Sequence, residues 1–234
     1  MHIYLDIETL PTADPAIIAE IAATVTPPGN ISKAETIAAW EAEKKPALVA
    51  QAVAKTSFDT LAGSIACICW AVDDGPVRAV FCDEDEGGML RVFFNVLGGS
   101  LQFPHSRIEA DTHTYVGHNI AGFDLPFLKH RAIVHGIKPN VSLWKAMHAK
   151  PWDSCIADTM LMWSADRERR VGLDKLCRAM GIPGKGDFDG SMVAATWPVD
   201  PEKVIAYCKG DVERVRAVYK RLTFSEAAAM KVAA

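Results

Sequence analysis

Two acidic side chains near the amino terminus have the spacing of a shared ligand set. Asp6 and Glu8 form an Asp-x-Glu motif at the end of residues 2–6, an apolar segment that predicts a strand. Side chains alternate along a strand, so both carboxylates point to the same face. Neighbouring acids repel each other unless they are solvated, hydrogen-bonded or bound to cations. An Asp-x-Glu motif occurs often by chance in a chain of this size. The motif alone therefore fits a solvated strand edge as well as part of a metal site.

A third acid, Asp124, stands where a loop leads into an expected helix. It closes the segment GHNIAGFD, residues 117–124. An acid at the start of a helix is often only a cap, but a cap does not account for Asn119 in the preceding loop. Phe123 and Phe127 follow at helical spacing. Such aromatic pairs usually pack in a core, and stacking on a nucleic-acid base is the functional alternative.

A phenol and a fourth acid share one face of an expected long helix, residues 201–222. Tyr207 and Asp211 are four residues apart, which places them on the same face. An ordinary surface pair and a functional pair both fit this spacing. Beside Asp211 runs an apolar stripe, so its carboxylate is expected to point partly inward. The stripe consists of Val204, Ile205, Val212, Val215, Val218 and Leu222.

The elements that must position these residues predict an α/β architecture. A strand pair at residues 65–72 and 77–82 is joined by an Asp-Asp-Gly-Pro turn and forms a hairpin. Beyond it, a strand at residues 114–116 is followed by helices expected at residues 123–135 and 172–180. A hairpin followed by strands alternating with helices indicates a mixed sheet flanked by helices.

One segment looks added to this compact core. Residues 32–55 are rich in alanine and favour helix, and Pro46 should divide them into a helical hairpin. We therefore expect a single domain of residues 1–224 with a helical insert at about residues 27–60. An alanine-rich tail, residues 225–234, follows. The insert is expected either to guide a bound strand or to mediate self-association.

The order of the acidic motifs resembles the DEDD superfamily of 3′→5′ exonucleases. The matching stretches are residues 6–10, 119–124 and 207–211. One subclass has histidine five residues before the last aspartate, and here that residue is Ala206. The other has tyrosine four residues before it, which is Tyr207 here. The chain thus resembles the tyrosine subclass (DEDDy), which includes ribonuclease D and the proofreading domains of family A and B DNA polymerases.

A further stretch, residues 172–190, is similar to stand-alone relatives of the family B polymerase exonuclease domain. The resemblance covers about residues 1–10 and 65–224 and leaves the insert unexplained. It implies a ribonuclease H-like fold, with a mixed central sheet between helices. It also implies metal-dependent hydrolysis of phosphodiester bonds at the 3′ ends of single-stranded DNA, releasing nucleoside monophosphates.

The implied cofactor is a pair of Mg²⁺ or Mn²⁺ ions. Two divalent ions about 3.5–4 Å apart activate water and neutralise the leaving oxygen, and hard cations prefer oxygen ligands. By resemblance, Asp6 would bridge both ions, Glu8 and Asp211 would complete the water-activating site, and Asp124 would bind the second ion largely through water. Tyr207 would orient the attacking water, since a phenol with a pKa near 10 is a poor base.

Other residues near the motifs are candidates for substrate contact. Thr9 and Leu10 would meet the terminal nucleotide, with Leu10 wedged against a base. His118 and Asn119 would contact sugar or phosphate, although loop hydrogen bonding fits them equally. The full set of substrate candidates is Thr9, Leu10, His118, Asn119, Phe123 and Phe127.

Two charged residues outside the motifs carry weaker expectations. Asp158 lies on an apolar segment, and we expect it to have a structural role. Lys185 precedes a glycine and could touch phosphate, although such a lysine more often lies on a solvated face.

Charge and cysteine content narrow the function classes. The net charge of −4 argues against tight non-specific DNA binding, but two divalent ions would add four positive charges at the site of chemistry.

No Cys-x-x-Cys pair occurs among the six cysteines, which fits reduced thiols in a cytoplasmic protein. Cys67 and Cys69 share one strand face, where packing is more typical than metal binding. We expect neither a membrane span nor a secretory signal.

Three functions remain open from the sequence. The favoured one is a DNA exonuclease, because no helical RNA-binding domain follows residue 224. An exoribonuclease is the first alternative, since ribonuclease D belongs to the same subclass. A catalytically inactive nucleic-acid-binding module is the second, and the presence of all four acids and Tyr207 argues against it. The oligomeric state is not predicted.

Overall fold

The computed structural model describes residues 1–82, 84–100, 113–164 and 170–225. Two compact units make up the chain. The larger unit combines residues 1–8 with residues 65–234, and the smaller consists of residues 9–64. None of the described helices is long and apolar enough to cross a membrane.

A five-stranded mixed sheet forms the centre of the fold, in the order β3-β2-β1-β4-β5. The strands are β1 (His2–Leu10), β2 (Ser64–Val72), β3 (Arg78–Phe81), β4 (Thr114–Gly117) and β5 (Ile156–Asp158). The predicted hairpin is confirmed, because β2 and β3 pair in antiparallel fashion. β4 pairs in parallel with both β1 and β5, so their carboxyl ends lie at one edge of the sheet. Such an edge is where ligands bind in open α/β sheets.

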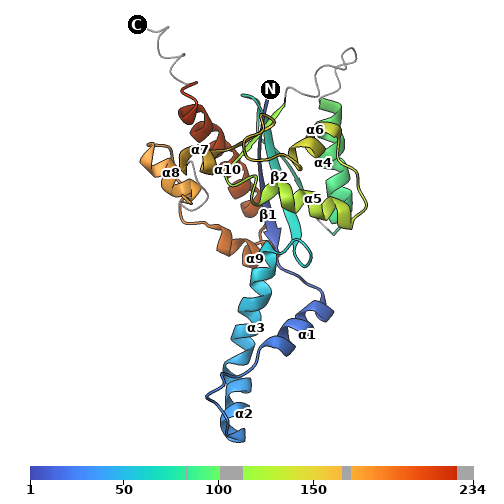
Figure 1. The fold of residues 1–234 in the computed structure, drawn as a ribbon, viewed down its shortest axis with the longest axis vertical. Helices are drawn as coiled ribbons and strands as arrows, with labels where there is room; N and C mark the ends of the chain where they lie inside the picture. The colour runs from blue at the N-terminus through green and yellow to red at the C-terminus, as the bar shows by residue number, and fades with distance from the viewer. Residues whose placement is uncertain (83, 101–112, 165–169, 226–234) are drawn as a thin grey trace. The chain divides into compact units, whose positions relative to one another are not determined.

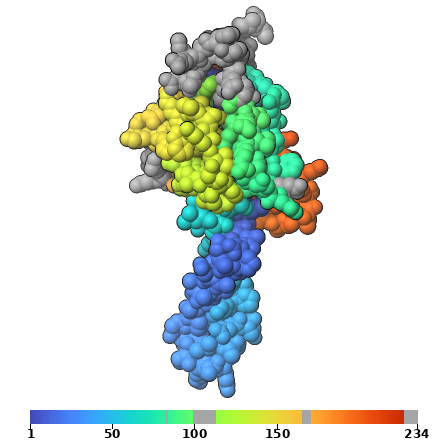
Figure 2. Space-filling model, turned by 90° about the vertical axis from the view of Figure 1, so that its right-hand side faces the viewer, coloured from blue at the N-terminus to red at the C-terminus, as the bar shows by residue number. Residues whose placement is uncertain are grey.

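Helices flank the sheet of the larger unit on both sides (Figure 1). One side carries α10 (Pro201–Leu222), with α7 (Thr159–Ser164), α8 (Leu173–Ala179) and α9 (Val193–Thr196) packed against it. The other side carries α4 (Glu86–Ser100), α5 (Asp124–Val134) and α6 (Val141–Ala146). These three helices form the green-to-yellow surface in Figure 2.

Alternation along β1 divides its side chains between the two faces of the sheet. Ile3, Leu5 and Ile7 are buried in a core that includes Phe93 of α4 and Leu128 of α5. The opposite face of β1 is directed at α10, as the edge-to-face contact between the rings of Tyr4 and Tyr219 shows. Asp6 and Glu8 belong to this second face because the side-chain period of a strand is two.

Helices make up the smaller unit. They are α1 (Pro15–Thr24), α2 (Ala34–Glu43), α3 (Lys45–Ala54) and the 3-10 helix η1 (Lys55–Phe58). Helical structure divides at Lys44, with Pro46 in the first turn of α3. The Lys44 N–H still donates to the Trp40 carbonyl, and the Leu48 N–H to the Lys44 carbonyl, so α3 continues from α2 without reversing direction (Figure 1). The predicted helical hairpin is therefore wrong, because a proline in the first turn of a helix is tolerated and forces no reversal. The unit starts at Thr9 and includes α1, which packs against α3. Residues 226–234 of the expected tail lie outside the described residues.

Candidate active site

Asp6 and Glu8 hold their carboxylates close together on the α10 side of β1. One oxygen of each, and the sulfur of Cys208, all lie within 4.8 Å of one another. Burial raises the pKa of Asp6 well above its usual range, and repulsion from Glu8, Asp211 and Asp124 raises it further. The pKa of Glu8 is likewise raised, first by burial. Asp6 Oδ2 is buried and has no hydrogen-bond partner in the described part of the chain.

Asp124 reaches the same site from the first turn of α5. It is 4% exposed, and its Oδ1 accepts a hydrogen bond from the backbone N–H of Ile7 at 3.2 Å. Burial raises the pKa of Asp124 to about 7, against the effect of its backbone hydrogen bonds. The helix cap position is Phe123, which makes no side-chain capping bond. This bond ties the Asp124 carboxylate to β1, the strand that carries Asp6 and Glu8.

The loop before Asp124 is a compact turn. Asn119 has a left-handed backbone, with φ of 64°, and its carbonyl accepts the N–H groups of Gly122 and Phe123. A Cβ at Gly122 would lie 2.5 Å from Asn119 Oδ1, so a larger residue would displace that side chain. The glycine thus lets the chain turn directly from β4 into α5.

Asp211 comes from the middle of α10 and occupies a buried position of its apolar stripe. With 3% exposure it points inward, as predicted. Both carboxylate oxygens carry cationic partners. Arg214 Nη1 donates to Oδ1 at 2.9 Å, and Lys185 Nζ donates to Oδ2.

Tyr207 lies one turn before Asp211 and shares its lysine partner. Lys185 Nζ donates to the Tyr207 hydroxyl at 2.8 Å, and the Phe188 ring packs with its centroid 4.9 Å from that of Tyr207. Burial and the charge of Asp211 raise the pKa of Tyr207, so the phenol keeps its proton at neutral pH. Burial lowers the pKa of Lys185, but attraction to Asp211 outweighs it and the pKa is raised overall.

Lys185 is the residue of this site that the sequence underrated. It was expected on a solvated face, and its position instead follows from the segment that carries it. Gly186, with φ of 69°, follows it, and Asp174 Oδ1 accepts its backbone N–H at 3.0 Å. The glycines at 184 and 186 were the available signal, since a lysine between two glycines is typical of a tight loop.

The cationic groups of the site are unevenly shared among its acids. Lys185 and Arg214 both pair with Asp211. Among the described residues, no salt bridge reaches Asp6, Glu8 or Asp124. Buried carboxylates without a cationic partner are costly. The carboxylates of the site supply oxygen donors, and the unpartnered buried oxygen of Asp6 fits a hard divalent cation.

The structure ties His118 into the protein. Its Nε2 donates to the carbonyl of Val171 at 2.7 Å, and Nδ1 lies 2.9 Å from Thr159 Oγ1. Burial lowers the pKa of His118, so the ring is neutral at pH 7. Of the two roles that the sequence allowed, these contacts favour loop hydrogen bonding over contact with sugar or phosphate.

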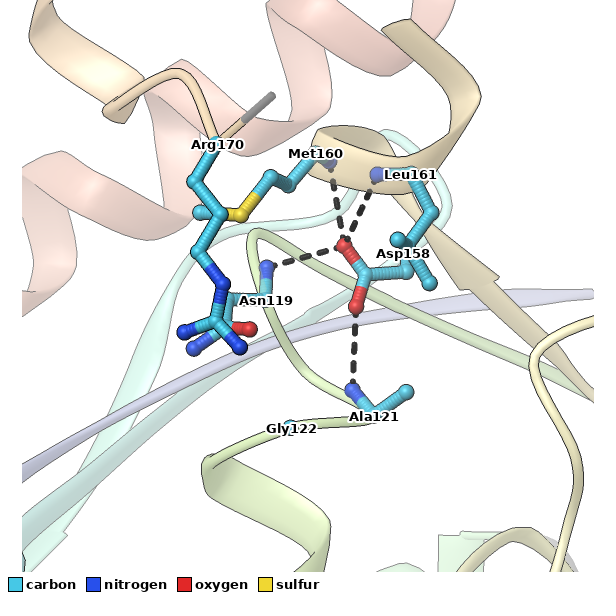
Figure 3. A pocket seen from close by; sticks show the side chains of 7 residues that line it. All are labelled: Asn119, Ala121, Gly122, Asp158, Met160, Leu161 and Arg170. Atoms are coloured by element: carbon cyan, nitrogen blue, oxygen red, sulfur yellow. Dashed lines mark hydrogen bonds between the residues drawn. The ribbon is translucent and has the colours of Figure 1, made fainter. Parts of the chain in front are cut away.

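Asp158 fixes the same loop from β5. Its carboxylate accepts the backbone N–H groups of Asn119, Ala121, Met160 and Leu161 (Figure 3). The expected structural role is confirmed. Beside these bonds lies a cavity of about 100 Å³. Asn119, Gly122 and Arg170 also line it, and contact of Asn119 with a nucleotide stays a prediction.

The two aromatic candidates differ in exposure. Phe127 has no exposed surface and lies in the core, so it offers no ring face to a base. The core alternative is the correct one for this residue. Phe123 is partly exposed, with its ring centroid 5.6 Å from that of Phe127.

Thr9 and Leu10 fall in the smaller unit. Thr9 Oγ1 donates to the carbonyl of Ser57 at 2.7 Å, which holds the end of β1 to η1. This bond gives the threonine hydroxyl a partner inside its own unit. Contact of either residue with a nucleotide stays a prediction.

The mixed five-stranded sheet with helices on both sides has the ribonuclease H-like fold. A solved structure supports the fold: the family B DNA polymerase from the hyperthermophilic archaeon Pyrobaculum calidifontis matches with a TM-score of 0.55 and 15% sequence identity. The match covers 95% of this chain and 24% of the polymerase, so the chain spans about a quarter of that protein's length. No curated protein sequence matches the chain.

The family follows from the sequence model that matches residues 100–231, more than half of the chain. Its description is a predicted 3′-5′ exonuclease related to the exonuclease domain of PolB. The chain belongs to this family, whose members are enzymes that hydrolyse phosphodiester bonds. Exonuclease domains of this kind depend on metal ions.

Proposed function

We propose that this protein removes nucleotides from the 3′ ends of single-stranded DNA with two divalent ions, Mg²⁺ or Mn²⁺, and releases nucleoside monophosphates. One observation carries the proposal. Acids from β1, α5 and α10 converge, and the buried Asp6 Oδ2 has no partner while no salt bridge compensates Asp6, Glu8 or Asp124 among the described residues. Buried polar groups that serve only the stability of a fold are normally hydrogen-bonded within the protein, and these carboxylates are not fully satisfied in this way.

Asp6, Glu8, Asp124 and Asp211 are the residues that would hold the ions. Bound there, divalent cations supply activated water and neutralise charge on the leaving oxygen. The chain's own contribution is to hold the four carboxylates on three rigid elements. The raised pKa values of Asp6, Glu8 and Asp124 indicate how strongly the metal-free site favours extra positive charge, in the form of protons or metal ions.

Tyr207 would act on the water and not on the metal. Its oxygen already accepts a hydrogen bond from Lys185 Nζ, so its own O–H remains available to donate. Phe188 packs against the ring and limits its rotation. We assign Tyr207 the positioning of the attacking water by a single hydrogen bond.

On metal binding, Asp211 would exchange the ammonium of Lys185 for a divalent ion. In the metal-free state Lys185 holds Oδ2, so a bound ion must compete with this ammonium. The lysine would then stay near the phosphate, where its positive charge offsets charge on the substrate.

The choice of DNA rests on the relationship to polymerase exonuclease domains. RNA recognition requires a contact to the 2′-hydroxyl, and the residues that would make or exclude this contact are not among the matched motifs. An exoribonuclease therefore serves as the competing outcome of the same experiment.

The experiment compares matched single-stranded DNA and RNA oligonucleotides, labelled at the 5′ end, with Mg²⁺, Mn²⁺ or excess EDTA. We expect a ladder of DNA products that shorten from the 3′ end, with no cleavage in EDTA. A DNA oligonucleotide with phosphorothioate linkages at its 3′ end is the control and should resist. Faster degradation of RNA than of DNA would show that RNA, and not DNA, is the preferred substrate. Undiminished hydrolysis in EDTA would refute the metal mechanism.

A further inference from the structure

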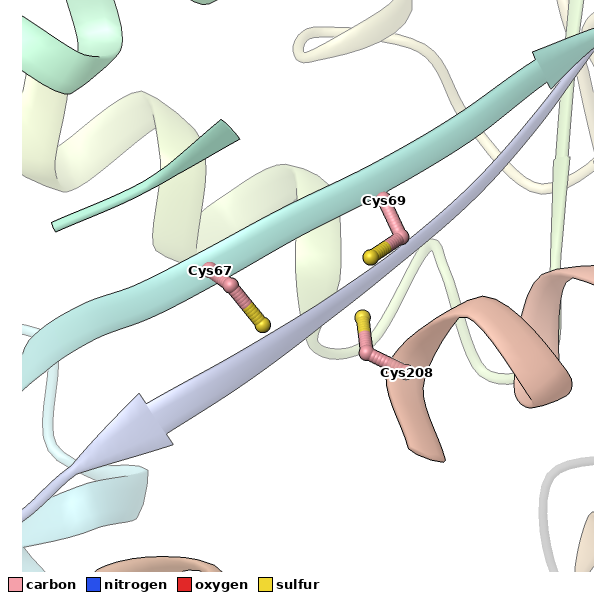
Figure 4. Close-up of side chains that lie close together, drawn as sticks. All are labelled: Cys67, Cys69 and Cys208. Carbon is pink, nitrogen blue, oxygen red and sulfur yellow. The ribbon is translucent and has the colours of Figure 1, made fainter. Parts of the chain in front are cut away.

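Three cysteines converge behind the catalytic acids. Cys67 and Cys69 project from β2, and Cys208 projects from α10 toward them (Figure 4). The three sulfur atoms lie within 4.8 Å of one another, and none of the three residues has any exposed surface. We name this group the thiol cluster.

The spacing of these sulfurs is close to that of a metal-thiolate site. A Zn–S bond of about 2.3 Å places the sulfurs of a tetrahedral or trigonal site about 3.8–4.0 Å apart. Side-chain movements of less than about 1 Å would bring three sulfurs within 4.8 Å to that separation. A hard ion such as Mg²⁺ would not compete for them, because it prefers oxygen.

The thiol cluster also adjoins the acid site. Cys208 Sγ lies within 4.8 Å of one carboxylate oxygen of Asp6 and one of Glu8, and it donates to the Asp6 carbonyl at 3.5 Å. A buried cysteine is often only a small apolar side chain. Cys208 differs because its sulfur lies close both to the two other thiols and to two carboxylates.

We propose that the thiol cluster binds one thiophilic divalent cation of the Zn²⁺ type, and that this ion inhibits the enzyme. Each ligating thiol releases its proton to solvent, and the metal–sulfur bonds replace the S–H bonds without any change in oxidation state. With all three thiolates bound, the divalent ion offsets two of their three negative charges, and the liganded cluster keeps one net negative charge.

Inhibition follows from position, and this part rests on the proposed function. Ligation draws Cys208 Sγ away from the Asp6 carbonyl and toward the two cysteines of β2. Cys208 directly follows Tyr207 on α10, so this movement displaces the phenol relative to the strand that carries Asp6 and Glu8. Metal binding itself does not depend on the proposed activity.

Binding is tested with Cd²⁺ as the probe, on the reduced, metal-stripped full chain. We expect a cadmium–thiolate absorption band that saturates at one equivalent and persists in excess Mg²⁺. Zn²⁺ should abolish the band by displacement. Cys69→Ala should lose most of it, whereas Cys177→Ala, which removes an equally buried thiol outside the cluster, should keep it.

Thermal unfolding establishes that both variants are folded. If Cys69→Ala is not, ¹¹³Cd NMR of the wild type takes its place, with one resonance at the shift of multiple sulfur ligands as the expected result. Absence of a thiolate band in the wild type, or an equal band in a folded Cys69→Ala, overturns the site.

The inhibitory effect is a separate measurement. Micromolar Zn²⁺ should slow Mg²⁺-dependent hydrolysis at least tenfold in the wild type and in Cys177→Ala, and much less in Cys69→Ala. Thiolate binding with equal inhibition of all three proteins would confirm the site and refute its effect on the enzyme. Failure of the proposed nuclease activity itself would appear as no hydrolysis without Zn²⁺, and would leave the cadmium result intact.

Discussion

Two buried clusters in the larger unit use carboxylates in opposite ways. Glu86, 7% exposed, accepts hydrogen bonds from Arg131 Nη2 at 2.6 Å and from the Ile65 N–H at 2.8 Å, and His135 Nε2 lies 2.8 Å from the same side chain. In the acid site, Asp6 Oδ2 is equally hidden from solvent and has no partner among the described residues. The first cluster is complete within the chain, and the second is not.

The pKa directions follow this difference. Burial raises the pKa of Glu86, but its bonds to Arg131, His135 and Ile65 outweigh burial and lower it overall. Asp6 is left with burial and like charges, which raise its pKa. A buried acid that the protein itself satisfies stabilises the fold. A buried acid without an internal partner is available to a ligand. Substitutions in each cluster test this difference.

The largest effect is expected for Asp6→Ala. Removal of one carboxylate should lower the rate of DNA hydrolysis on the order of 10³-fold or more, because metal-assisted stabilisation amounts to several kcal/mol. The melting temperature in EDTA should stay the same or rise, since like-charge repulsion is relieved. Hydrolysis rate and thermal unfolding are measured on the same preparation. Near-wild-type turnover would remove Asp6 from the site.

The next effect separates Tyr207 from the acids. Tyr207→Phe keeps the ring and its packing on Phe188, and it loses the hydrogen bond from Lys185 together with the proposed one to the attacking water. We expect kcat to fall about 10–10³-fold with little change in KM, as for a group that acts mainly in the transition state. Asp211→Asn should instead weaken metal binding and lose nearly all activity. The measurement is a Mn²⁺ titration of the rate for each protein.

Two results of that titration would contradict the division of roles. A fully active Tyr207→Phe would make Tyr207 a packing residue. A shift of the Mn²⁺ midpoint as large as that of Asp211→Asn would place the phenol in the metal site.

The Glu86 cluster should show the opposite pattern, with a loss of stability and no loss of metal binding. Glu86→Gln removes a buried negative charge that faces the Arg131 guanidinium, which we expect to destabilise the protein by about 3 kcal/mol. For a chain of this size, the melting temperature should fall roughly 6–12 °C. Metal dependence of the rate at low temperature should be unchanged. A loss of Mn²⁺ affinity with normal stability would reverse the assignment of the two clusters.

The smallest effect is a pH dependence of stability in EDTA. Folding raises the pKa of Asp124 to about 7, so its stabilising contribution is complete below the ordinary pKa near 4 and is lost as the pH rises through about 7. Between about pH 5.5 and pH 8, the free energy of unfolding should therefore fall with rising pH, on the order of 2 kcal/mol. Glu86, with its lowered pKa, stays ionised throughout this range.

Chemical unfolding across this pH range gives the measurement, with Asp124→Asn as the control. The variant should lose much of the slope, and saturating Mn²⁺ should reduce it in the wild type. A slope of the same size in Asp124→Asn would show that other groups cause it.

Much of the site was predictable because its motifs are local. The strand period placed Asp6 and Glu8 together, and the helical period placed Tyr207 with Asp211. Residues 201–222 were predicted as a helix with the bounds that α10 has. Asp200 caps this helix and Pro201 starts it, both of which are signals readable in sequence.

The remaining features depend on contacts between distant residues. Lys185 reaches Tyr207 and Asp211 across 22 and 26 residues, and no local pattern encodes that approach. The same holds for Cys208 and Cys67, which meet only because α10 packs on the face of β2. Phe127 had the spacing of both a core residue and a stacking residue, and only its burial decides between them.

The number of divalent ions bound at the acid site tests the central claim most directly. We would titrate the EDTA-treated full chain with Mn²⁺ by calorimetry, beside Asp6→Ala and Glu86→Gln. The account predicts two ions per chain for the wild type and for Glu86→Gln, and a loss of at least one ion in Asp6→Ala. Equal Mn²⁺ binding by the wild type and Asp6→Ala would contradict it, because the unpartnered carboxylate would then have no part in holding metal.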